Sequence, residues 1–143
     1  MFYVYYHTEN YAYVGTRDYT AYCCVGAALE FRATLGDRDI MRYNHNLAMF
    51  AQRHLAEAWG TEALAPDAFV AAMCNVRLPV DSFEQAWALA GVLLNKHDTM
   101  VVVFKYHGAA WLRLSAQIFL EQQDVVELGQ LVLAILPTLP TNQ

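Results

Sequence analysis

An arginine in the stretch "AWLRLSA" has surroundings that could support chemistry. Strand-like alternation puts Leu112 and Leu114 on one face of this stretch, the natural side for packed helices. Arg113 then projects from the other face, between Trp111 and Ser115. A guanidinium fixed in this way can grip a carboxylate through two parallel hydrogen bonds, a charge-assisted contact worth about 1.5–3 kcal/mol. A solvated arginine on an exposed sheet face is the alternative, and the pattern alone favours it.

A glycine and a threonine just before an apolar run form a second candidate, in the stretch "AYVGTRDYTAY". Gly15 allows close approach, Thr16 offers a hydroxyl, and the start of a following helix offers free N–H groups. Together they could bind an anion, above all a phosphate. The alternative is that Thr16 only caps the helix, which is worth about 1 kcal/mol. For Arg17 and Asp18 we expect a local role, either as a pair or in orienting the loop.

Other residue types give no catalytic or metal-binding pattern. His45 and His54 are not spaced to share one helix face, and the cysteines Cys23, Cys24 and Cys74 form no CxxC pair. We therefore predict no metal site and expect reduced thiols that behave as small buried hydrophobes. The sequence contains no P-loop, no GxSxG motif and no dinucleotide fingerprint.

Composition limits the class of protein. The 143 residues suit one domain, and 57% of them are hydrophobic while only 16% are charged. This composition indicates either a core larger than the chain's own surface needs or apolar surface that meets another protein. The net charge of −5 and the lack of a basic run argue against nucleic acid as a partner. No apolar stretch reaches the roughly 18–20 residues of a membrane-spanning helix. The N-terminal "MFYVYYHTEN" is not a secretory signal, so we expect a cytoplasmic protein.

The hydrophobic pattern predicts the elements that must position these residues. A helix over 18–35 is apolar all round, so we expect it to be buried on several sides. The next helix lies between Gly36-Asp37 and Gly60 and is amphipathic, with a stripe made of Ile40, Tyr43, Leu47, Phe50, Ala51, Leu55 and Ala58. The remaining predicted elements are an extended segment at 2–6, a strand at 71–78 ended by Pro79, a helix capped by Ser82 and Gln85, a hairpin turning at His107-Gly108, and a helix over 121–136.

The third helix and the fold follow from this order. Phe83, Ala86, Trp87, Ala90, Leu93 and Leu94 supply its predicted buried side. Helix, helix, strand, helix, strand, strand, helix predicts an α+β fold, with a small, mostly antiparallel sheet and helices packed on one face.

The chain also resembles a known family. The stretches "GTRDYTAYCCVGAALEFRATLG", "YNHNLA", "LAEAWGTEALAP", "VRLP" and "WLRLSAQIF" occur in the order found in the C-terminal part of class V aminotransferase-fold enzymes, which depend on pyridoxal phosphate (PLP). The nearest branches are the isopenicillin N epimerase-like and hercynylcysteine sulfoxide lyase-like proteins, with cysteine desulfurases more distant. The resemblance runs from Tyr13 to Leu136. It implies an interface segment at 1–17 and, at 18–143, the small C-terminal domain of PLP-dependent transferase fold type I.

The resemblance also implies roles for the candidate residues. Thr16 matches the threonine that contributes to the cofactor-phosphate site of the neighbouring subunit in a homodimer, with Gly15, Arg17 and Asp18 as loop support. Arg113 matches the arginine that binds the α-carboxylate of an amino-acid substrate. The sequence departs from the family where Phe119-Leu120 replace a common Tyr-Asn pair.

The family's large domain, with its Schiff-base lysine, has no counterpart in this sequence. The only lysines, Lys96 and Lys105, both follow the Gly-Thr motif, outside that lysine's context. We therefore expect a fragment that is inactive alone and holds PLP only with a large domain or complementary chain. The completed enzyme would act on an amino acid by epimerisation, by cleavage of a C–S bond or by transamination. The alternatives are a non-catalytic interaction module that keeps the fold, and an α+β binding domain unrelated to PLP enzymes.

Overall fold

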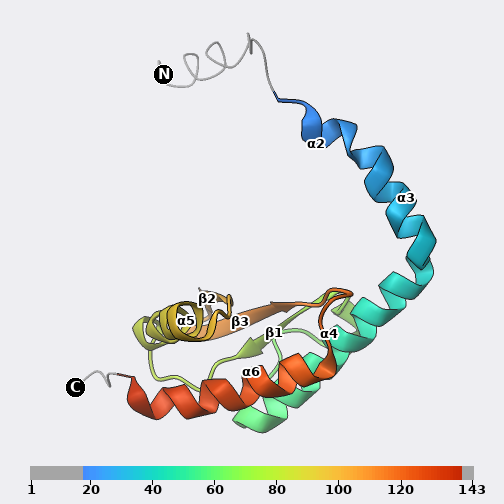
Figure 1. The fold of residues 1–143 in the computed structure, drawn as a ribbon. Coiled ribbons are helices and arrows are strands. Elements are labelled where there is room, and N and C mark those ends of the chain that lie inside the picture. Colours follow the sequence, from blue (N-terminus) through green and yellow to red (C-terminus); the bar gives the residue numbers. More distant parts are fainter. Residues whose placement is uncertain (1–17, 140–143) are drawn as a thin grey trace, which may run out of the picture. The chain divides into compact units, whose positions relative to one another are not determined.

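A computed structural model of the chain describes residues 18–139 (Figure 1). The chain divides into two compact units, Met1–Asp37 and Arg38–Gln143, and each is considered by itself. The extended segment predicted at 2–6 and the interface segment predicted at 1–17 lie outside the described residues. Within residues 18–139, no helix combines the length and the apolar character needed to cross a membrane.

The described part of the first unit is helical. Helix α2 (Thr20–Cys23) and helix α3 (Val25–Leu35) meet at Cys24, and Gly36 ends α3 with a positive φ of 85°. The predicted helix over 18–35 is therefore confirmed, with a turn inside it.

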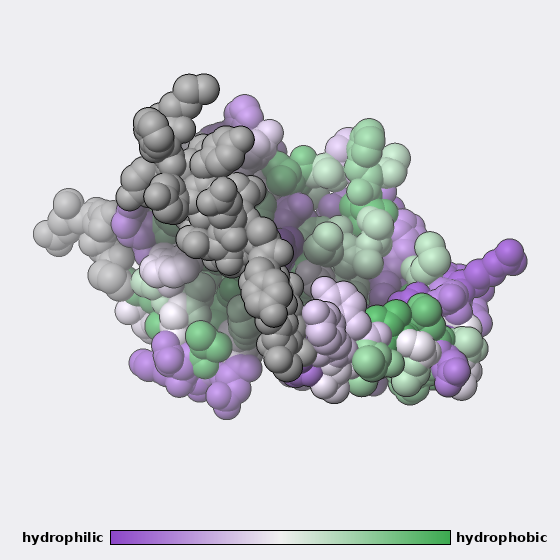
Figure 2. Space-filling model, turned by 90° about the horizontal axis from the view of Figure 1, so that it is seen from above, coloured by the Kyte–Doolittle hydropathy of each residue, from purple (hydrophilic) through white to green (hydrophobic). Residues whose placement is uncertain are grey.

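The prediction that this helix is buried within the chain is wrong. Neither α2 nor α3 has a buried residue, and Tyr22, Leu29 and Phe31 are 76%, 61% and 60% exposed. The reason is that apolar residues surround the helix axis, so no single face gathers enough of them to pack on one neighbour. On the face of the molecule that Figure 2 presents, hydrophobic residues likewise lie at the surface among hydrophilic ones.

The second unit contains a three-stranded antiparallel sheet. Strands β1 (Met73–Arg77), β2 (Val102–Tyr106) and β3 (Ala109–Ser115) pair in the order β1-β3-β2, so β3 is central. The predicted strand and hairpin are both confirmed. His107 and Gly108 make the turn with positive φ angles of 47° and 77°, the conformation that tight hairpin turns require.

Helices α4 (Asp37–Trp59), α5 (Phe83–His97) and α6 (Gln122–Ile135) cover one face of this sheet. In Figure 1, α5 lies over β2 and β3, and α6 runs beside α4. One hydrophobic core joins the three helices to the sheet residues Cys74, Val76, Val103, Ala110 and Leu112. The predicted α+β fold, with helices on one face of an antiparallel sheet, is confirmed.

Helix α4 follows its prediction closely. It ends before Gly60, whose φ is 63°, and four residues of the predicted stripe are buried: Ile40, Leu47, Ala51 and Leu55. Tyr43 and Ala58 are exposed instead. Tyr43 lies at the edge of the stripe, where its hydroxyl donates a hydrogen bond to the carbonyl oxygen of Leu120 at 2.6 Å.

The start of α5 differs slightly from the predicted capping box. Ser82 Oγ accepts from the backbone N–H of Gln85 at 3.1 Å, as expected. The Gln85 side chain, however, accepts from the backbone N–H of Asp81 at 3.0 Å, one residue earlier than in a standard box. The buried side of α5 is Ala86, Leu89 and Leu93, so the predicted burial of Trp87 and Leu94 is wrong. Both lie off the face that these three residues define.

Helix α6 packs closely on α4. Its start is a capping box in which Glu121 and Asp124 satisfy each other's backbone N–H groups. Trp59 Nε1 donates to the carbonyl oxygen of Gly129 at 3.1 Å, and a Cβ atom built on Gly129 would lie 3.1 Å from Leu55 Cδ2. Short 3-10 turns, η1 (Asp67–Phe69) and η2 (Leu136–Thr138), complete the described elements.

Candidate functional site

Arg113 lies at the centre of the sheet, on the face that the helices leave open. It pairs with Asn75 of β1 and Val102 of β2, so both neighbouring strands fix its backbone. The adjacent Leu112 is fully buried in the core, and Arg113 itself is exposed. The alternation predicted for this strand is confirmed, and it holds the guanidinium on a rigid support.

The Arg113 side chain has no hydrogen bond or ion pair with any described residue. Four other arginines each contact a carboxylate: Arg32 with Asp37, Arg42 with Asp39, Arg53 with Asp67, and Arg77 with Glu62. An arginine that keeps all its donors available on a fixed strand is suited to bind an anionic ligand.

Trp111 and Ser115 flank Arg113 on the same face. Trp111 is only 5% exposed but lies outside the helix-side core, opposite Arg77 and Phe104 in the register. Its Nε1 donates to the carbonyl oxygen of Tyr106 at 3.0 Å. This bond fixes the indole, so the open face of the sheet has one rigid aromatic wall beside an exposed cation.

Of the residues around the predicted phosphate site at 15–18, the structure describes only Asp18. Gly15, Thr16 and Arg17 lie outside the described residues, so the phosphate role of Thr16 stays a prediction. Asp18 accepts hydrogen bonds from the backbone N–H of Thr20, at 2.8 Å, and from the Thr20 hydroxyl. These bonds lower the pKa of the Asp18 carboxyl and tie it to the start of α2. The predicted pairing with Arg17 or support of the loop stays a prediction, because Arg17 lies outside the described residues.

The lysines do not converge on Arg113. Lys105 pairs with Ala110 and therefore belongs to the opposite face of the sheet from Arg113. Lys96 lies in the last turn of α5 and is exposed. In the described part of the chain, no three His, Cys, Asp or Glu side chains cluster as a metal site requires. Among the described residues, Arg113 therefore has no lysine beside it.

The cysteines differ from expectation. Only Cys74 is a buried small hydrophobe, and burial raises the pKa of its thiol to about 11. Cys23 and Cys24 are exposed, so the prediction of burial is wrong for both. They belong to the first unit, whose described helices have no buried face.

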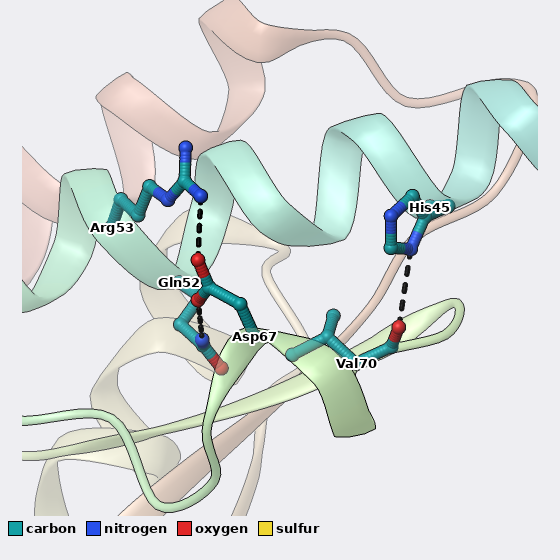
Figure 3. Close-up of polar contacts among 5 residues, drawn as sticks. All are labelled: His45, Gln52, Arg53, Asp67 and Val70. Carbon is teal, nitrogen blue, oxygen red and sulfur yellow. Dashed lines mark hydrogen bonds and ion pairs between the residues drawn. The ribbon is translucent and has the colours of Figure 1, made fainter.

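A polar cluster that the sequence did not reveal fastens the 60–72 loop to α4 (Figure 3). Asp67 accepts from Gln52 Nε2 at 3.0 Å and from the Arg53 guanidinium, which holds the pKa of Asp67 below its usual value. His45 Nδ1 lies 3.1 Å from the carbonyl oxygen of Val70. Gln52 lies on α4 and Asp67 lies in a loop without periodicity, so no spacing signal could have joined them.

The fold itself occurs in a protein that binds PLP. The chain superimposes on part of Oryza sativa TDC, in its crystal structure with PLP and tryptamine, with a TM-score of 0.56 and 15% sequence identity. The match covers 68% of this chain and 22% of that one. At this identity the similarity establishes a shared fold.

Sequence comparison finds more specific relatives. The chain is 31% identical to L-cysteine desulfhydrase from Arabidopsis thaliana over 79% of its length, and 25% identical to hercynylcysteine sulfoxide lyase from Schizosaccharomyces pombe over 81%. It spans only 30% and 29% of these two curated proteins. No family model matches the chain. The chain is thus related to part of proteins named for lysis of sulfur-containing amino acids.

Proposed function

We propose that this chain forms the small domain of a PLP-dependent enzyme that cleaves a C–S bond in an amino acid. The observation that carries the proposal is Arg113, an exposed guanidinium on a fixed central strand with no ion pair among the described residues. The names of the two relatives support the reaction class, and the fold shared with a PLP-bound protein supports the cofactor.

In this proposal the chain's own residues bind and orient the substrate. Arg113 grips the α-carboxylate, and the fixed indole of Trp111 restricts the space beside it. PLP, when bound by a lysine-bearing large domain, supplies the electron sink for the chemistry. Thr16 contributes to the phosphate site of a neighbouring subunit. Since Lys96 and Lys105 do not meet Arg113, this chain alone does not catalyse the reaction.

The test is an Arg113→Ala substitution in the assembly that contains the lysine-bearing large domain. We expect kcat/KM for L-cysteine to fall by about ten- to a hundredfold, since one charge-assisted contact is lost. The cofactor absorbance should stay unchanged, because the guanidinium holds substrate and not PLP. Arg38→Ala is the matched control, since Arg38 is also exposed and has no ion pair among the described residues. An unaltered kcat/KM in the Arg113 variant would refute the carboxylate role.

A non-catalytic interaction module is the second candidate, favoured by the exposed apolar side chains of α3. Absorbance titration of the chain with PLP, with and without candidate partner domains, separates the two functions. The enzyme proposal predicts a saturable cofactor band only when the large domain is present. Partner binding without any such band, in every combination, supports the module.

A further inference from the structure

A pocket lies on the helix side of the sheet, next to the place where β2 begins. β2 starts at Val102, opposite Arg113, while β3 continues to Ser115. A pocket of about 290 Å³ is bounded here by residues 99–102, by the end of β3 and by the first turns of α6. This volume is close to the lower end of the roughly 300–1,000 Å³ typical of small-molecule sites, so it suits a small organic ligand.

The walls of this pocket are apolar. They are made of side chains that belong to the helix-side core or pack against it: Val101, Leu112, Leu114, Leu120, Val125 and Leu128. Leu112 and Val125 are 0% and 2% exposed, so the pocket reaches the hydrophobic interior. Met100 also lines the pocket and is 79% exposed, which places it at the mouth. Such walls favour a ligand with an apolar body.

The guanidinium of Arg113 is not part of these walls. Val102, Arg113 and Ser115 also border the pocket. Alternation along the strands, however, places their side chains on the open face of the sheet, away from Leu112 and Leu114. These three residues therefore meet the pocket through their backbone. The described lining contains no lysine and no histidine, so no cationic side chain faces the pocket from the helix side.

Asp124 supplies the negative charge of the pocket. It is the one acidic residue in the described lining. Its Oδ2 accepts a hydrogen bond from the backbone N–H of Glu121 at 2.7 Å, and the Glu121 side chain accepts in turn from the backbone N–H of Asp124. These N–H groups at the start of α6 are thus already used. An anion would meet carboxylates here, whereas a cation would meet acceptors.

Two further oxygen atoms can accept hydrogen bonds from a ligand. The Thr99 hydroxyl donates to the carbonyl oxygen of His97 at 2.8 Å, so its lone pairs remain available. Ala116 N donates to Ala72 O at 2.8 Å on the β1 side, so the backbone groups of Ser115 point to the β2 side. The β2 register ends one pair earlier, and the Ser115 carbonyl oxygen has no strand partner there.

We propose that this pocket binds a small organic ammonium ion with an apolar body. Asp124 holds the ammonium group, with Thr99 Oγ1 or the Ser115 carbonyl oxygen as a further acceptor, and the apolar body lies against Val125 and Leu128. The net charge of −5 also attracts a cation in preference to an anion. The inference goes beyond the proposed function, because it concerns the helix side of the sheet and makes no use of Arg113.

The experiment titrates the full chain with hexylamine, hexanol, hexanoate and ethylamine at neutral pH, followed by carbon–proton methyl NMR. We expect hexylamine to bind at least about tenfold more tightly than hexanoate, with hexanol between them, because only the amine carries the charge that Asp124 attracts. Ethylamine should bind at least about tenfold more weakly than hexylamine, because each buried methylene favours binding.

The methyl signals locate the ligand. Those of Leu114, Val125 and Leu128 should shift in a saturable way, since these side chains form the walls. The methyl signal of Met73 should stay in place, because Met73 pairs with Ser115 and belongs to the open face of the sheet. Saturable shifts at Met73 without shifts at the three wall residues would overturn the assignment of the pocket.

Asp124→Asn tests the charge. The variant keeps a side-chain oxygen that can accept from the Glu121 N–H, so the helix start is preserved. Hexylamine affinity should fall by about three- to tenfold, and hexanol affinity should stay unchanged. Glu127→Gln is the matched control, since it removes an exposed negative charge from the same helix, outside the described lining. It should leave the affinity of both ligands unchanged.

Three outcomes would overturn the inference. The first is equal affinity for hexylamine, hexanol and hexanoate, which would remove the charge preference and needs no variant to be folded. The second is an equal loss of hexylamine affinity in Asp124→Asn and Glu127→Gln, which would reduce the effect to net charge. The third is the absence of saturable shifts at the wall residues.

Discussion

The Arg113 guanidinium differs from most described arginines because it has no ion pair with a carboxylate in the part of the chain that the structure describes. Its position could be predicted, because strand alternation fixes the face of each residue once a buried leucine is known. The strand beside it could not be bounded in the same way, because the run "MVVVFKY" gives no sign that β2 begins to pair at Val102.

Asp67 gives a prediction about pH at the same scale. The hydrogen bond from Arg53 lowers the pKa of Asp67, so its stabilising effect is present above the ordinary aspartate pKa of about 3.9. That effect is lost as the pH falls through the lower, folded-state pKa. We expect Asp67→Asn to reduce the urea midpoint at pH ~7 and to reduce it less as the pH falls below ~3.9.

Urea unfolding of wild type and variant across this pH range measures the effect. Glu57→Gln serves as control, since it removes another exposed carboxylate of the same region, on α4. A difference between wild type and Asp67→Asn that stays constant down to the lowest pH would contradict the role assigned to the ionised carboxylate.

At the scale of elements, the positions of the helices in the sequence were easier to predict than the face of each helix that is buried. The caps and glycines predicted both ends of α4 and the start of α5, because those signals are local. The face of α5 predicted to be buried included Trp87, which is 66% exposed. The face that is buried carries the smaller Leu89 instead. Hydrophobic character does not reveal which side meets the sheet when apolar residues occupy more than one side of a helix.

The contact between α4 and α6 gives a second prediction. Gly129 leaves only 3.1 Å between an added Cβ and Leu55 Cδ2, whereas Gly91 of α5 has nothing within 4 Å of such an atom. Gly91→Ala should therefore stabilise the protein by about 0.5–1 kcal/mol through helix propensity. Gly129→Ala should gain less, and Gly129→Val should destabilise by about 1–3 kcal/mol through overpacking.

Chemical denaturation of these three variants measures the differences in unfolding free energy. Gly91→Ala is the matched control, because it makes the same change in a helix where space is available. If Gly129→Val were as stable as wild type, the helices would have room to separate, and the close approach would not limit packing.

At the scale of the whole molecule, the apolar residues of α3 stand without a covering partner among the described residues of their own unit. We expect this helix to be covered by a second protein surface, either a second copy of the chain or a large domain. The sequence shows an excess of apolar residues, and its pattern predicted that those of the helix over 18–35 are buried within the chain. Burial within a chain and burial between chains leave the same composition, so the sequence could not distinguish the two.

Self-association tests this expectation. A double substitution, Leu29→Gln with Phe31→Gln, should shift the chain toward monomer in sedimentation velocity experiments, since it removes two exposed apolar side chains of α3. Trp87→Gln changes an exposed aromatic residue of α5 and should leave the distribution unchanged. A concentration-dependent dimer that persists in the α3 variant would assign the association to another surface.

The position of Trp111 has an optical consequence. The chain has three tryptophans, and they report on separate regions: Trp59 on the contact of α4 with α6, Trp87 on the solvent side of α5, and Trp111 on the open face of the sheet. With Trp59 and Trp87 replaced by phenylalanine, the remaining indole emits from two residues away from Arg113. Its fluorescence would register the arrival of a ligand or a covering domain in real time, without any added label.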